Sequence, residues 1–350
     1  MQRSRLPRLC FIPILIFLVH TLSAIASTVA IGNCQPHLPS YHTISAAIDD
    51  VPAGSTVLVC PGTYPEQITI TASITLRGVF PIALRPAIIT VPKGGVVATQ
   101  IDVEGTLYTP RTVVNLSNLV VDGSGSTGAV GIGFFNAEGH LSHLEVRNQA
   151  RGIVLGSVAF QAPVTVEDSY IHEFDSIGVE PSEGGVLNFT VDLHRNLITS
   201  SKSTVDAGVW YSGASGTISE SLIWLRTGIG LNISDPYAFV TARQNTISGA
   251  DVGIEEIGFF GINVIQKNAI VGNSTGIVAL GNAVLSSNAI AQSSVQAIDL
   301  TCSPFFLSVE NNVIYSSPVG IANILPTDTI TSNKFWNVAT QTTECENPPF

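Results

Sequence analysis

Side chains capable of chemistry gather in one part of this chain, on successive copies of a repeated phrase. Directly after one apolar position of the phrase, consecutive repeats carry Glu180, Trp210, Gly230 and Glu255. Aromatic rings pack on the apolar faces of sugars, and carboxylates accept hydrogen bonds from hydroxyl groups. Gly230 would form the floor of a notch, and Tyr211 would add a second ring beside Trp210. These residue types are typical of a surface that binds a polysaccharide.

A second set of charged residues lies three positions before the same apolar residue, where consecutive repeats carry Asp206, Arg226 and Asp251. The structural interpretation is a surface ladder of ion pairs, worth about 0–1 kcal/mol for each exposed pair. The catalytic interpretation is two carboxylates about 9–10 Å apart, near the upper limit for an inverting glycosidase. In a lyase, Arg226 would act as the base, and a carboxylate-bound Ca²⁺ would neutralise a uronate. Glu180 and Glu255 complete the set of candidate catalytic residues.

The repeat that positions these residues has two apolar columns. The first recurs every 20–27 residues, at Val121, Val146, Ile171, Ile198, Ile223, Ile247, Ile270, Ile290, Ile314 and Phe335. The second follows a short turn and reads Gly131-Ile132, Gly152-Ile153, Gly178-Val179, Gly208-Val209, Gly228-Ile229, Gly253-Ile254, Gly276-Ile277, Ala297-Ile298 and Gly320-Ile321. Self-similarity at this period indicates a solenoid, in which each repeat buries its apolar face against its neighbours.

A column of asparagines lies two positions before the first apolar column, at Asn196, Asn245, Asn268, Asn288, Asn312 and Asn333, with Ser169 and Ser221 in two gaps. Leucine-rich repeats also carry an Asn in each unit, but they require an L-x-x-L-x-L series that is absent here. Ile and Val dominate the columns, and these residues favour strands. We therefore predict an all-β fold, a single-stranded right-handed parallel β-helix. Each Asn would occupy a left-handed turn position and bond the amides above and below.

The two ends of the solenoid differ in their sequence patterns. Residues 42–52 carry apolar side chains at helical spacing and end at a Pro-Ala-Gly stop, which predicts a helix that caps the first coil. Residues 337–350 are polar and contain two adjacent prolines, so we expect a C-terminal tail. No linker composition interrupts the chain, so residues 27–350 are predicted to form one domain.

Residues 1–26 read as a signal peptide, with three arginines, an apolar run of about fourteen residues and an Ala-Ile-Ala cleavage pattern. The run is shorter than the roughly 20 residues that a spanning helix needs. Cleavage would remove three of the 15 basic residues and none of the 26 acidic ones, which moves the net charge from −11 to −14. We expect a monomer that is secreted, periplasmic or extracellular, with no membrane span in the mature protein. An acidic chain is unsuited to nucleic acid, and it repels polyanionic sugars unless cations bridge the charges.

Four cysteines remain after cleavage, Cys34, Cys60, Cys302 and Cys345. An even number in an exported chain favours disulfides, and four cysteines allow three connectivities. Two lie near each end of the solenoid, so we predict the pairs Cys34–Cys60 and Cys302–Cys345. No C-x-x-C spacing supports zinc, and no metal site is assigned.

The chain resembles the pectin lyase-like superfamily of secreted right-handed parallel β-helix proteins. The resemblance rests on these columns and on the opening from Ile44-Ser45-Ala46-Ala47-Ile48 to Gly62-Thr63-Tyr64-Pro65-Glu66. The resemblance implies a leaning toward glycans. The motifs of polygalacturonases, pectinesterases and alginate epimerases are absent, and only Asp206 echoes an aspartate of the first. The resemblance also places active sites on the strand of the Gly-Ile column.

Two functional hypotheses remain open. The first is an exported protein that engages a polysaccharide, as a binder or as a lyase or hydrolase. The second is a structural or surface-interaction protein in which the solenoid serves as a rigid rod and the acidic surface keeps it in solution.

Overall fold

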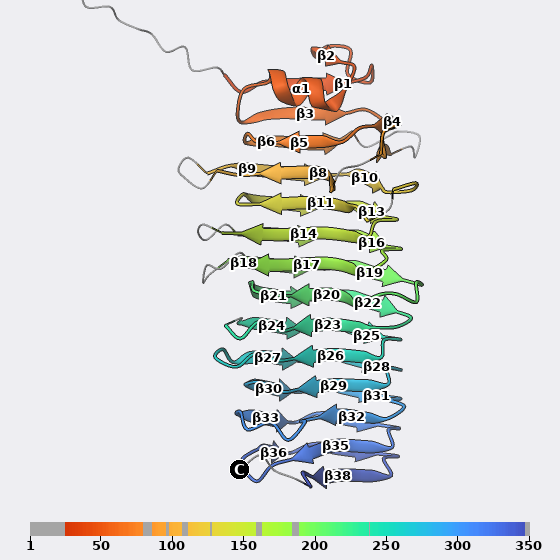
Figure 1. Cartoon of the computed structure of the whole chain (residues 1–350), viewed down its shortest axis with the longest axis vertical. Helices are drawn as coiled ribbons and strands as arrows, with labels where there is room; N and C mark the ends of the chain where they lie inside the picture. The colour runs from red at the N-terminus through yellow and green to blue at the C-terminus, as the bar shows by residue number, and fades with distance from the viewer. Residues whose placement is uncertain are drawn as a thin grey trace, which may run out of the picture.

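The computed structural model describes residues 25–79, 86–95, 98–106, 111–126, 128–158, 163–183, 189–237 and 239–346. The chain winds into a tall stack of coils, with the N-terminal segment at one end and the C-terminal segment at the other (Figure 1). Each complete coil contributes one strand to each of three sheets, all paired in parallel, and the sheets contain 14, 12 and 12 strands. The predicted all-β parallel solenoid is confirmed.

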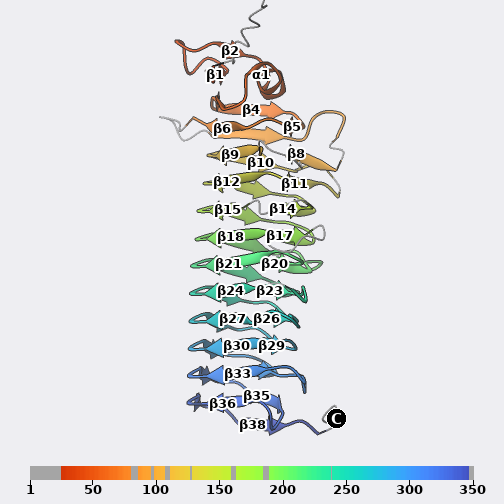
Figure 2. The ribbon, with the colours of Figure 1, turned by 90° about the vertical axis from the view of Figure 1, so that its left-hand side faces the viewer.

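Sheet A has 14 strands, and it lies opposite sheet C in the view of Figure 2. In spatial order its strands are β2 (Ser40–Tyr41), β1 (Thr28–Ile31), β3 (Ser55–Val59), β6 (Ile74–Gly78), β9 (Val113–Ser117), β12 (Glu138–Ser142), β15 (Val164–Glu167), β18 (Thr190–His194), β21 (Ser215–Ser219), β24 (Val240–Arg243), β27 (Asn263–Gln266), β30 (Ala283–Ser286), β33 (Leu307–Glu310) and β36 (Thr329–Thr331).

Sheet B follows sheet A along each coil. Its strands are β4 (Gly62–Pro65), β7 (Ala87–Thr90), β10 (Leu119–Asp122), β13 (Glu145–Arg147), β16 (Tyr170–His172), β19 (Leu197–Ser200), β22 (Leu222–Leu225), β25 (Thr246–Ser248), β28 (Ala269–Val271), β31 (Ala289–Ala291), β34 (Val313–Tyr315) and β37 (Lys334–Trp336).

Sheet C completes each coil before the chain returns to sheet A. Its strands are β5 (Ile68–Ile70), β8 (Thr99–Glu104), β11 (Val130–Phe135), β14 (Arg151–Ser157), β17 (Ile177–Glu183), β20 (Ala207–Tyr211), β23 (Ile229–Ile233), β26 (Val252–Glu256), β29 (Thr275–Ala279), β32 (Gln296–Asp299), β35 (Val319–Ile324) and β38 (Thr340–Glu344).

The core is the space enclosed by the three sheets, and the predicted apolar columns fill it. In sheet B the register places Ile247 beside Ile270, and Ile270 beside Ile290. Ile247 and Ile270 have no exposed surface, and Ile290 has 1%. Because side chains alternate across a strand, the intervening residues face solvent. The columns therefore fix which side chains each coil presents outward.

The asparagine column forms a continuous hydrogen-bonded ladder at the corner between sheets A and B. The Oδ1 atom of Asn268 accepts from the backbone N–H and the side-chain Nδ2 of Asn245, both at 3.0 Å. Asn268 in turn donates through Nδ2 to Asn288 at 3.0 Å and to the carbonyl of Ala242 at 2.9 Å. One detail of the prediction was wrong: the left-handed residue is the one before the asparagine, Lys267, with φ of 56°.

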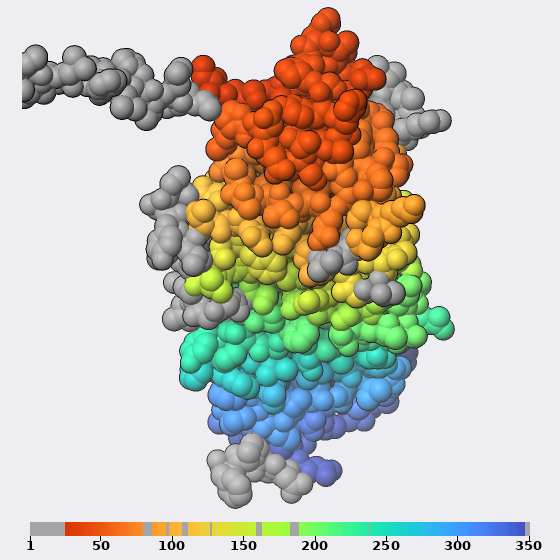
Figure 3. Space-filling model, turned by 45° about the horizontal axis from the view of Figure 1, so that its top comes forward, coloured from red at the N-terminus to blue at the C-terminus, as the bar shows by residue number. Residues whose placement is uncertain are grey.

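The predicted helix at residues 42–52 is present as α1 (Ile44–Asp50). It begins where the Thr43 hydroxyl accepts from the N–H of Ala46, which is a standard N-cap. The N-terminal segment that contains α1 lies over one end of the stack (Figure 3). Ile44 is fully buried and belongs to the main core cluster. The capping role of α1 stays a prediction.

Both predicted disulfides are present, Cys34–Cys60 with a Cα–Cα distance of 5.7 Å and Cys302–Cys345 with 5.5 Å. The C-terminal tail was predicted in part wrongly. Residues 340–344 form β38, which pairs with β35 as a final edge strand, because their threonines suit an extended backbone despite their polarity. The predicted signal peptide, residues 1–26, lies almost wholly outside the described residues. Among the residues that are described, no helix has the length and apolar character to cross a membrane.

Candidate functional site

The outer face of sheet C carries a row of polar and aromatic side chains on four adjacent strands. The register pairs Trp210 of β20 with Asn232 of β23, and Asn232 with Glu255 of β26. Glu180 lies at the equivalent position on β17, which pairs with β20 on its other side. The structure thus brings together Glu180, Trp210 and Glu255, and it adds Asn232, which sequence reasoning missed.

Gly230 was misplaced by the sequence analysis. The register sets Val209 beside Leu231, so the equivalent of Gly208-Val209 is Gly230-Leu231 and not Gly228-Ile229. The segment contains two overlapping Gly-apolar pairs, and the sequence alone could not choose between them. Strand pairing selects the second, so Gly230 is not the floor of an outward notch.

Gly230 instead lies where the backbone of sheet C packs closely on the core. A Cβ atom built on it would lie 2.4 Å from Cγ2 of Ile247 and 2.5 Å from the carbonyl oxygen of Gly253. Any larger residue there would displace the backbone or the core side chain. The glycine column of the repeat therefore reflects this tight approach, and Gly230 has a structural role.

Tyr211 was also predicted to bind substrate, and the structure places it elsewhere. Its side chain points into the core and is fully buried, because it follows the outward-facing Trp210 on the same strand. Its hydroxyl donates to the carbonyls of Val191 at 3.0 Å and Thr217 at 3.3 Å. Burial raises its pKa well above the ordinary value. Tyr211 ties the core to sheet A and is not a surface ring.

The row on sheet C is held in place by neighbouring polar groups. The indole Nε1 of half-buried Trp210 donates to the Ser234 hydroxyl at 2.6 Å. Asn232 donates through Nδ2 to Glu255 at 3.0 Å, and burial raises the pKa of Glu255. At the other end of the row, Arg151 forms an ion pair of 2.8 Å with Glu180, whose side chain is 13% exposed. These bonds fix the side chains before any ligand binds.

The predicted Asp-Arg-Asp ladder does not form. In the correct register, Gly228 and not Arg226 lies between Asp206 and Asp251. The N–H of Gly228 donates to Asp251 at 2.8 Å, and the Ser176 hydroxyl donates to Asp206 at 2.6 Å. Arg226 is exposed in the turn between sheets B and C, and no ion pair among the described residues involves it. The two carboxylates flank a position with no side chain.

Sequence reasoning also missed the environment of Glu256, which follows Glu255 and points inward. It is fully buried, and its Oε1 accepts from Gly258 N–H at 2.7 Å and from Asn263 Nδ2 at 2.8 Å. Its Oε2 accepts from Gly281 N–H at 3.1 Å. Burial raises its pKa to about 7, although these three hydrogen bonds favour the charged form. The inward direction of Glu256 was predictable, because side chains alternate along a strand and Glu255 points outward. The hydrogen bonds of Glu256 give it a structural role at the corner between sheets C and A.

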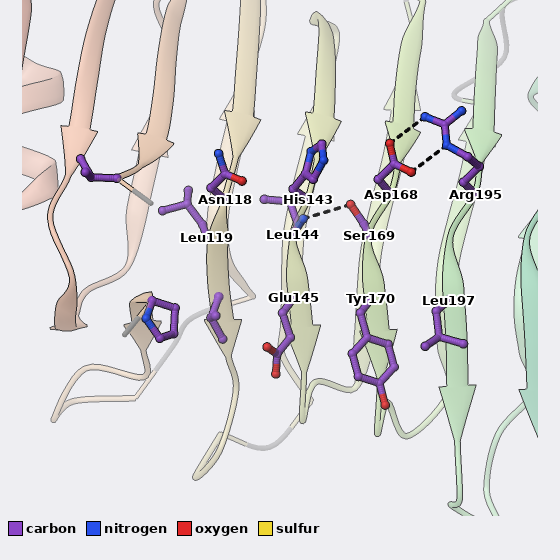
Figure 4. A pocket seen from close by; sticks show the side chains of 13 residues that line it. Asn118, Leu119, His143, Leu144, Glu145, Asp168, Ser169, Tyr170, Arg195 and Leu197 are labelled. Atoms are coloured by element: carbon purple, nitrogen blue, oxygen red, sulfur yellow. Dashed lines mark hydrogen bonds and ion pairs between the residues drawn. The ribbon is translucent and has the colours of Figure 1, made fainter. Parts of the chain in front are cut away.

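A separate hollow, the corner groove, lies at the corner between sheets A and B and has a volume of about 590 Å³. Its lining includes Leu119, Leu144, Tyr170 and Leu197, which come from successive coils. Figure 4 shows these side chains on neighbouring strands, with His143, Asp168 and Arg195 grouped at one end of those strands. The floor is apolar because Leu119 and Leu144 occupy the positions that asparagines hold in later coils.

Two charged residues of the corner groove, Asp168 and Arg195, pair with each other. Arg195 donates two hydrogen bonds to Asp168, at 2.7 and 2.6 Å (Figure 4). The ring of Tyr170 is 38% exposed and stacks on His172, with centroids 4.0 Å apart. The corner groove therefore presents an apolar strip beside the Asp168–Arg195 pair and Glu145, which pairs with Arg147 outside the groove.

Among the residues that the structure describes, no three His, Cys, Asp or Glu side chains lie close enough together to hold a metal ion. A calcium ion on the sheet C face would have to take most of its oxygen ligands from a bound sugar or from water.

Comparison of the fold with solved structures finds right-handed parallel β-helix proteins of the pectin lyase-like fold. The A-module of mannuronan C-5 epimerase AlgE4 from Azotobacter vinelandii matches with a TM-score of 0.59 and 16% identity, over 87% of this chain and 93% of that one. The AlgE6 A-module from the same organism gives 0.61 and 15%, over 87% and 91%. The Agl-KA catalytic domain gives 0.53 and 15%, over 85% and 63%. At these identities the likeness establishes the fold alone.

No curated protein matches the chain in sequence. A family model described as "Protein of unknown function (DUF1565)" matches residues 33–333, which is most of the chain. The protein therefore belongs to the DUF1565 family.

Proposed function

We propose that the protein is exported and binds a polysaccharide across the outer face of sheet C, between β17 and β26. The observation that carries this proposal is the row of Glu180, Trp210, Asn232 and Glu255 on four adjacent strands. An aromatic ring flanked by fixed hydrogen-bonding groups suits a sugar chain, which presents apolar ring faces and hydroxyls in alternation. The shared fold with mannuronan epimerases is consistent with a glycan ligand.

The charge of the face favours a neutral sugar over a uronate. The chain has a net charge of −11, and the row contains two carboxylates against one arginine, Arg151. Carboxylates accept hydrogen bonds from hydroxyl groups, whereas they repel the carboxylates of a polyuronate unless a cation bridges them. We therefore expect neutral polysaccharides to bind without added metal, and uronic ones only with Ca²⁺.

Spacing along the stack favours binding over hydrolysis by the row itself. Glu180 and Glu255 are three coils apart, about 14 Å at the strand spacing of a sheet. The two carboxyl groups of a glycosidase are about 5–9.5 Å apart. This pair is therefore too widely separated to act on one glycosidic bond.

A second candidate function, inverting hydrolysis, rests on Asp206 and Asp251. They are two coils apart, about 9–10 Å, which is the upper end of the range for an inverting pair. Both are exposed, and no side chain lies between them at Gly228. Arg226 is no longer proposed as a catalytic base, because it does not lie between them.

The test is a panel of neutral and uronic polysaccharides, with and without Ca²⁺, scored for bound sugar, new reducing ends and unsaturated products. Trp210→Ala should weaken binding at least about tenfold, since an aromatic stacking platform is lost. Trp224→Ala is the matched control, because Trp224 is 43% exposed on sheet B and should leave binding unchanged. Equal binding by the parent and Trp210→Ala would exclude the sheet C site. New reducing ends that vanish in Asp206→Asn or Asp251→Asn would establish the hydrolase.

A further inference from the structure

Another hollow, the sheet A hollow, lies on the outer face of sheet A and has a volume of about 300 Å³. Its lining comes from β15, β18, β21 and β24, which are stacked one above another in Figure 2. The lining consists mainly of hydroxyls, carboxylates, an imidazole and a guanidinium. These groups are capable of chemistry, and they are separate from the row on sheet C.

One column of the sheet A hollow places four different functional groups in order. The register pairs Glu167 with His194, and His194 with Ser219. Arg243 follows Ser219 on the next strand. Equivalent positions on adjacent strands face the same side of a sheet at a spacing of about 4.8 Å. The four residues are separated by 27, 25 and 24 positions in the chain, so no local motif marks them.

The hydroxyl of Ser219 is bonded to the imidazole. Its Oγ lies 2.8 Å from Nδ1 of His194, and the residue is 3% exposed at the wall of the hollow. The hydroxyl of Ser221, in contrast, donates to the carbonyl of Ser219 at 3.1 Å and so stabilises the turn. In the described part of the chain, the Ser219 hydroxyl bonds no backbone group. A hydroxyl that donates to a neutral imidazole is the arrangement of a nucleophile and its general base.

Charges on either side of this pair suit proton transfer and the formation of an oxyanion. Glu167 lies beside His194, and its carboxylate is held by His140 at 2.8 Å and Arg195 at 3.1 Å. A carboxylate beside an imidazole favours the positively charged imidazolium. On the other side of the serine lies Arg243, and a guanidinium there would stabilise negative charge on a reacting oxygen.

We propose that the sheet A hollow is an esterase site for small neutral carboxylic esters, with Ser219 as the nucleophile and His194 as the base. The Oγ atom attacks the carbonyl carbon of the ester, and its proton passes to Nδ1 of His194. Arg243 stabilises the oxyanion. The C–O bond to the alcohol then breaks, and the alcohol takes the proton from His194. Water attacks the acyl carbon next and gives a proton to His194, which returns it to Ser219 as the carboxylic acid leaves.

The lining of the hollow selects the kind of ester. The carboxylates of Glu167 and Asp192 repel an anionic acyl group or a phosphate. A volume of about 300 Å³ admits a small acyl group and the adjoining part of its alcohol. Thr165 and Thr217 supply hydroxyls that bond a polar alcohol such as a sugar. An O-acetyl group on a neutral sugar meets these requirements.

The experiment has two readouts on the full chain. The first is acetate release from glucose pentaacetate, and the second is attachment of a fluorophosphonate, located by peptide mass spectrometry. We expect the parent to release acetate and to carry the label on Ser219. Ser219→Ala and His194→Gln should each lower the rate at least about 100-fold, and Arg243→Gln at least about tenfold. Urea midpoints would verify that the variants are folded.

Ser142→Ala is the matched control. Ser142 occupies the same column as Ser219 three coils earlier and is 8% exposed, but it lies outside the hollow. This variant should match the parent in rate and in labelling.

The pH dependence tests Glu167, which acts through His194. The rate should fall at acid pH, where the imidazole takes up a proton and no longer accepts from the hydroxyl. Glu167→Gln should move this fall to lower pH, because the imidazolium loses a neighbouring negative charge. A fall that stays in place would overturn the role given to Glu167.

Labelling of the parent keeps the test decisive even where a variant fails to fold. A parent that releases no acetate, or that carries no label on Ser219, would overturn the proposal. So would acetate release that persists in Ser219→Ala, because the nucleophile would then lie elsewhere. Neither readout requires a polysaccharide on sheet C, so this proposal and the proposed function fail independently.

Discussion

The corner between sheets A and B is built in two ways along the molecule, although the backbone is the same in both. In the later coils, a left-handed residue precedes an asparagine whose side chain bonds the coil on either side, as at Asn268 and Asn288. In the earlier coils the left-handed residue is kept at Asn118 and His143, but a leucine follows it. Identical turns are thus closed either by amide bonds or by apolar packing.

The difference shows how a repeat can change surface without changing fold. An asparagine ladder satisfies the buried backbone groups of the turn. Leu119 and Leu144 leave the turn without those amides and provide the apolar floor of the corner groove. The Ser169 hydroxyl marks the boundary, since it accepts from Leu144 N–H at 3.1 Å and is the first polar member of the ladder.

The largest effect is expected where the ladder is broken by the residue type of the groove. Asn268→Leu removes the acceptor of the Asn245 N–H and the donor to the Ala242 carbonyl. Two buried groups without partners should lower the free energy of unfolding by about 3–4 kcal/mol. Urea denaturation measures the change in the free energy of unfolding. The control is Thr246→Ala at an exposed position, which should change the free energy of unfolding by less than about 0.5 kcal/mol. If the urea midpoints of Asn268→Leu and Thr246→Ala overlapped, the amide hydrogen bonds would not stabilise the fold.

The later coils also contain Glu256, and its effect depends on pH. Its pKa is raised from 4.5 to about 7, so the folded state binds the proton more tightly than the unfolded chain. Its contribution to stability is fully present below pH 4.5 and is lost as the pH rises through 7, by about 3 kcal/mol. The fall in stability between pH 4.5 and 8 should shrink by that amount in Glu256→Gln. An unchanged pH profile in this variant would refute the assignment.

The earlier coils should show the opposite dependence through Asp122. Burial raises its pKa, but hydrogen bonds from Ser124, Asn148 and Arg147 outweigh burial and lower it from 3.8 to about 2. The stability it contributes is present above pH 3.8 and is lost as the pH falls through 2, by about 2 kcal/mol. Asp122→Asn should therefore be less stable than the parent at pH 6 and should match it near pH 2. A difference that persists at pH 2 would point to packing instead.

The smallest effect is expected for the reverse exchange, Leu144→Asn. Leu144 is 2% exposed, so the change loses apolar burial, but the new amide can accept from the backbone N–H of Leu119 and extend the ladder by one coil. The partial compensation should limit the loss to about 1 kcal/mol. The same urea series measures it against Asn268→Leu. An equal or greater loss than in that variant would show that the two corners are not interchangeable.

The columns of Ile and Asn were predictable because they are periodic, and each member repeats the same physical requirement. The register of Ile247, Ile270 and Ile290 and the bonds of Asn268 follow the predicted repeat. The cysteine pairs were predictable for a different reason, since only neighbours along the stack can meet. The register was not predictable at residues 228–231, because this segment contains two overlapping Gly-apolar pairs, and each pair allows a different alignment with the neighbouring coils.

The site was less predictable than the fold because it depends on individual side chains. One shift of register replaced Gly230 by Asn232 in the sheet C row and removed Arg226 from between the two aspartates. Tyr211 was assigned to the surface on composition, although alternation from Trp210 places it in the core. The corner groove had no sequence signal, because it arises where a pattern is missing.

The most direct test of the sheet C assignment is a crystal structure of the protein with an oligosaccharide from whichever polysaccharide it retains. We predict sugar density across β17, β20, β23 and β26, with one ring against Trp210 and hydroxyls within hydrogen-bond distance of Glu180 and Glu255. Density in the corner groove, or anywhere other than the outer face of sheet C, would contradict it.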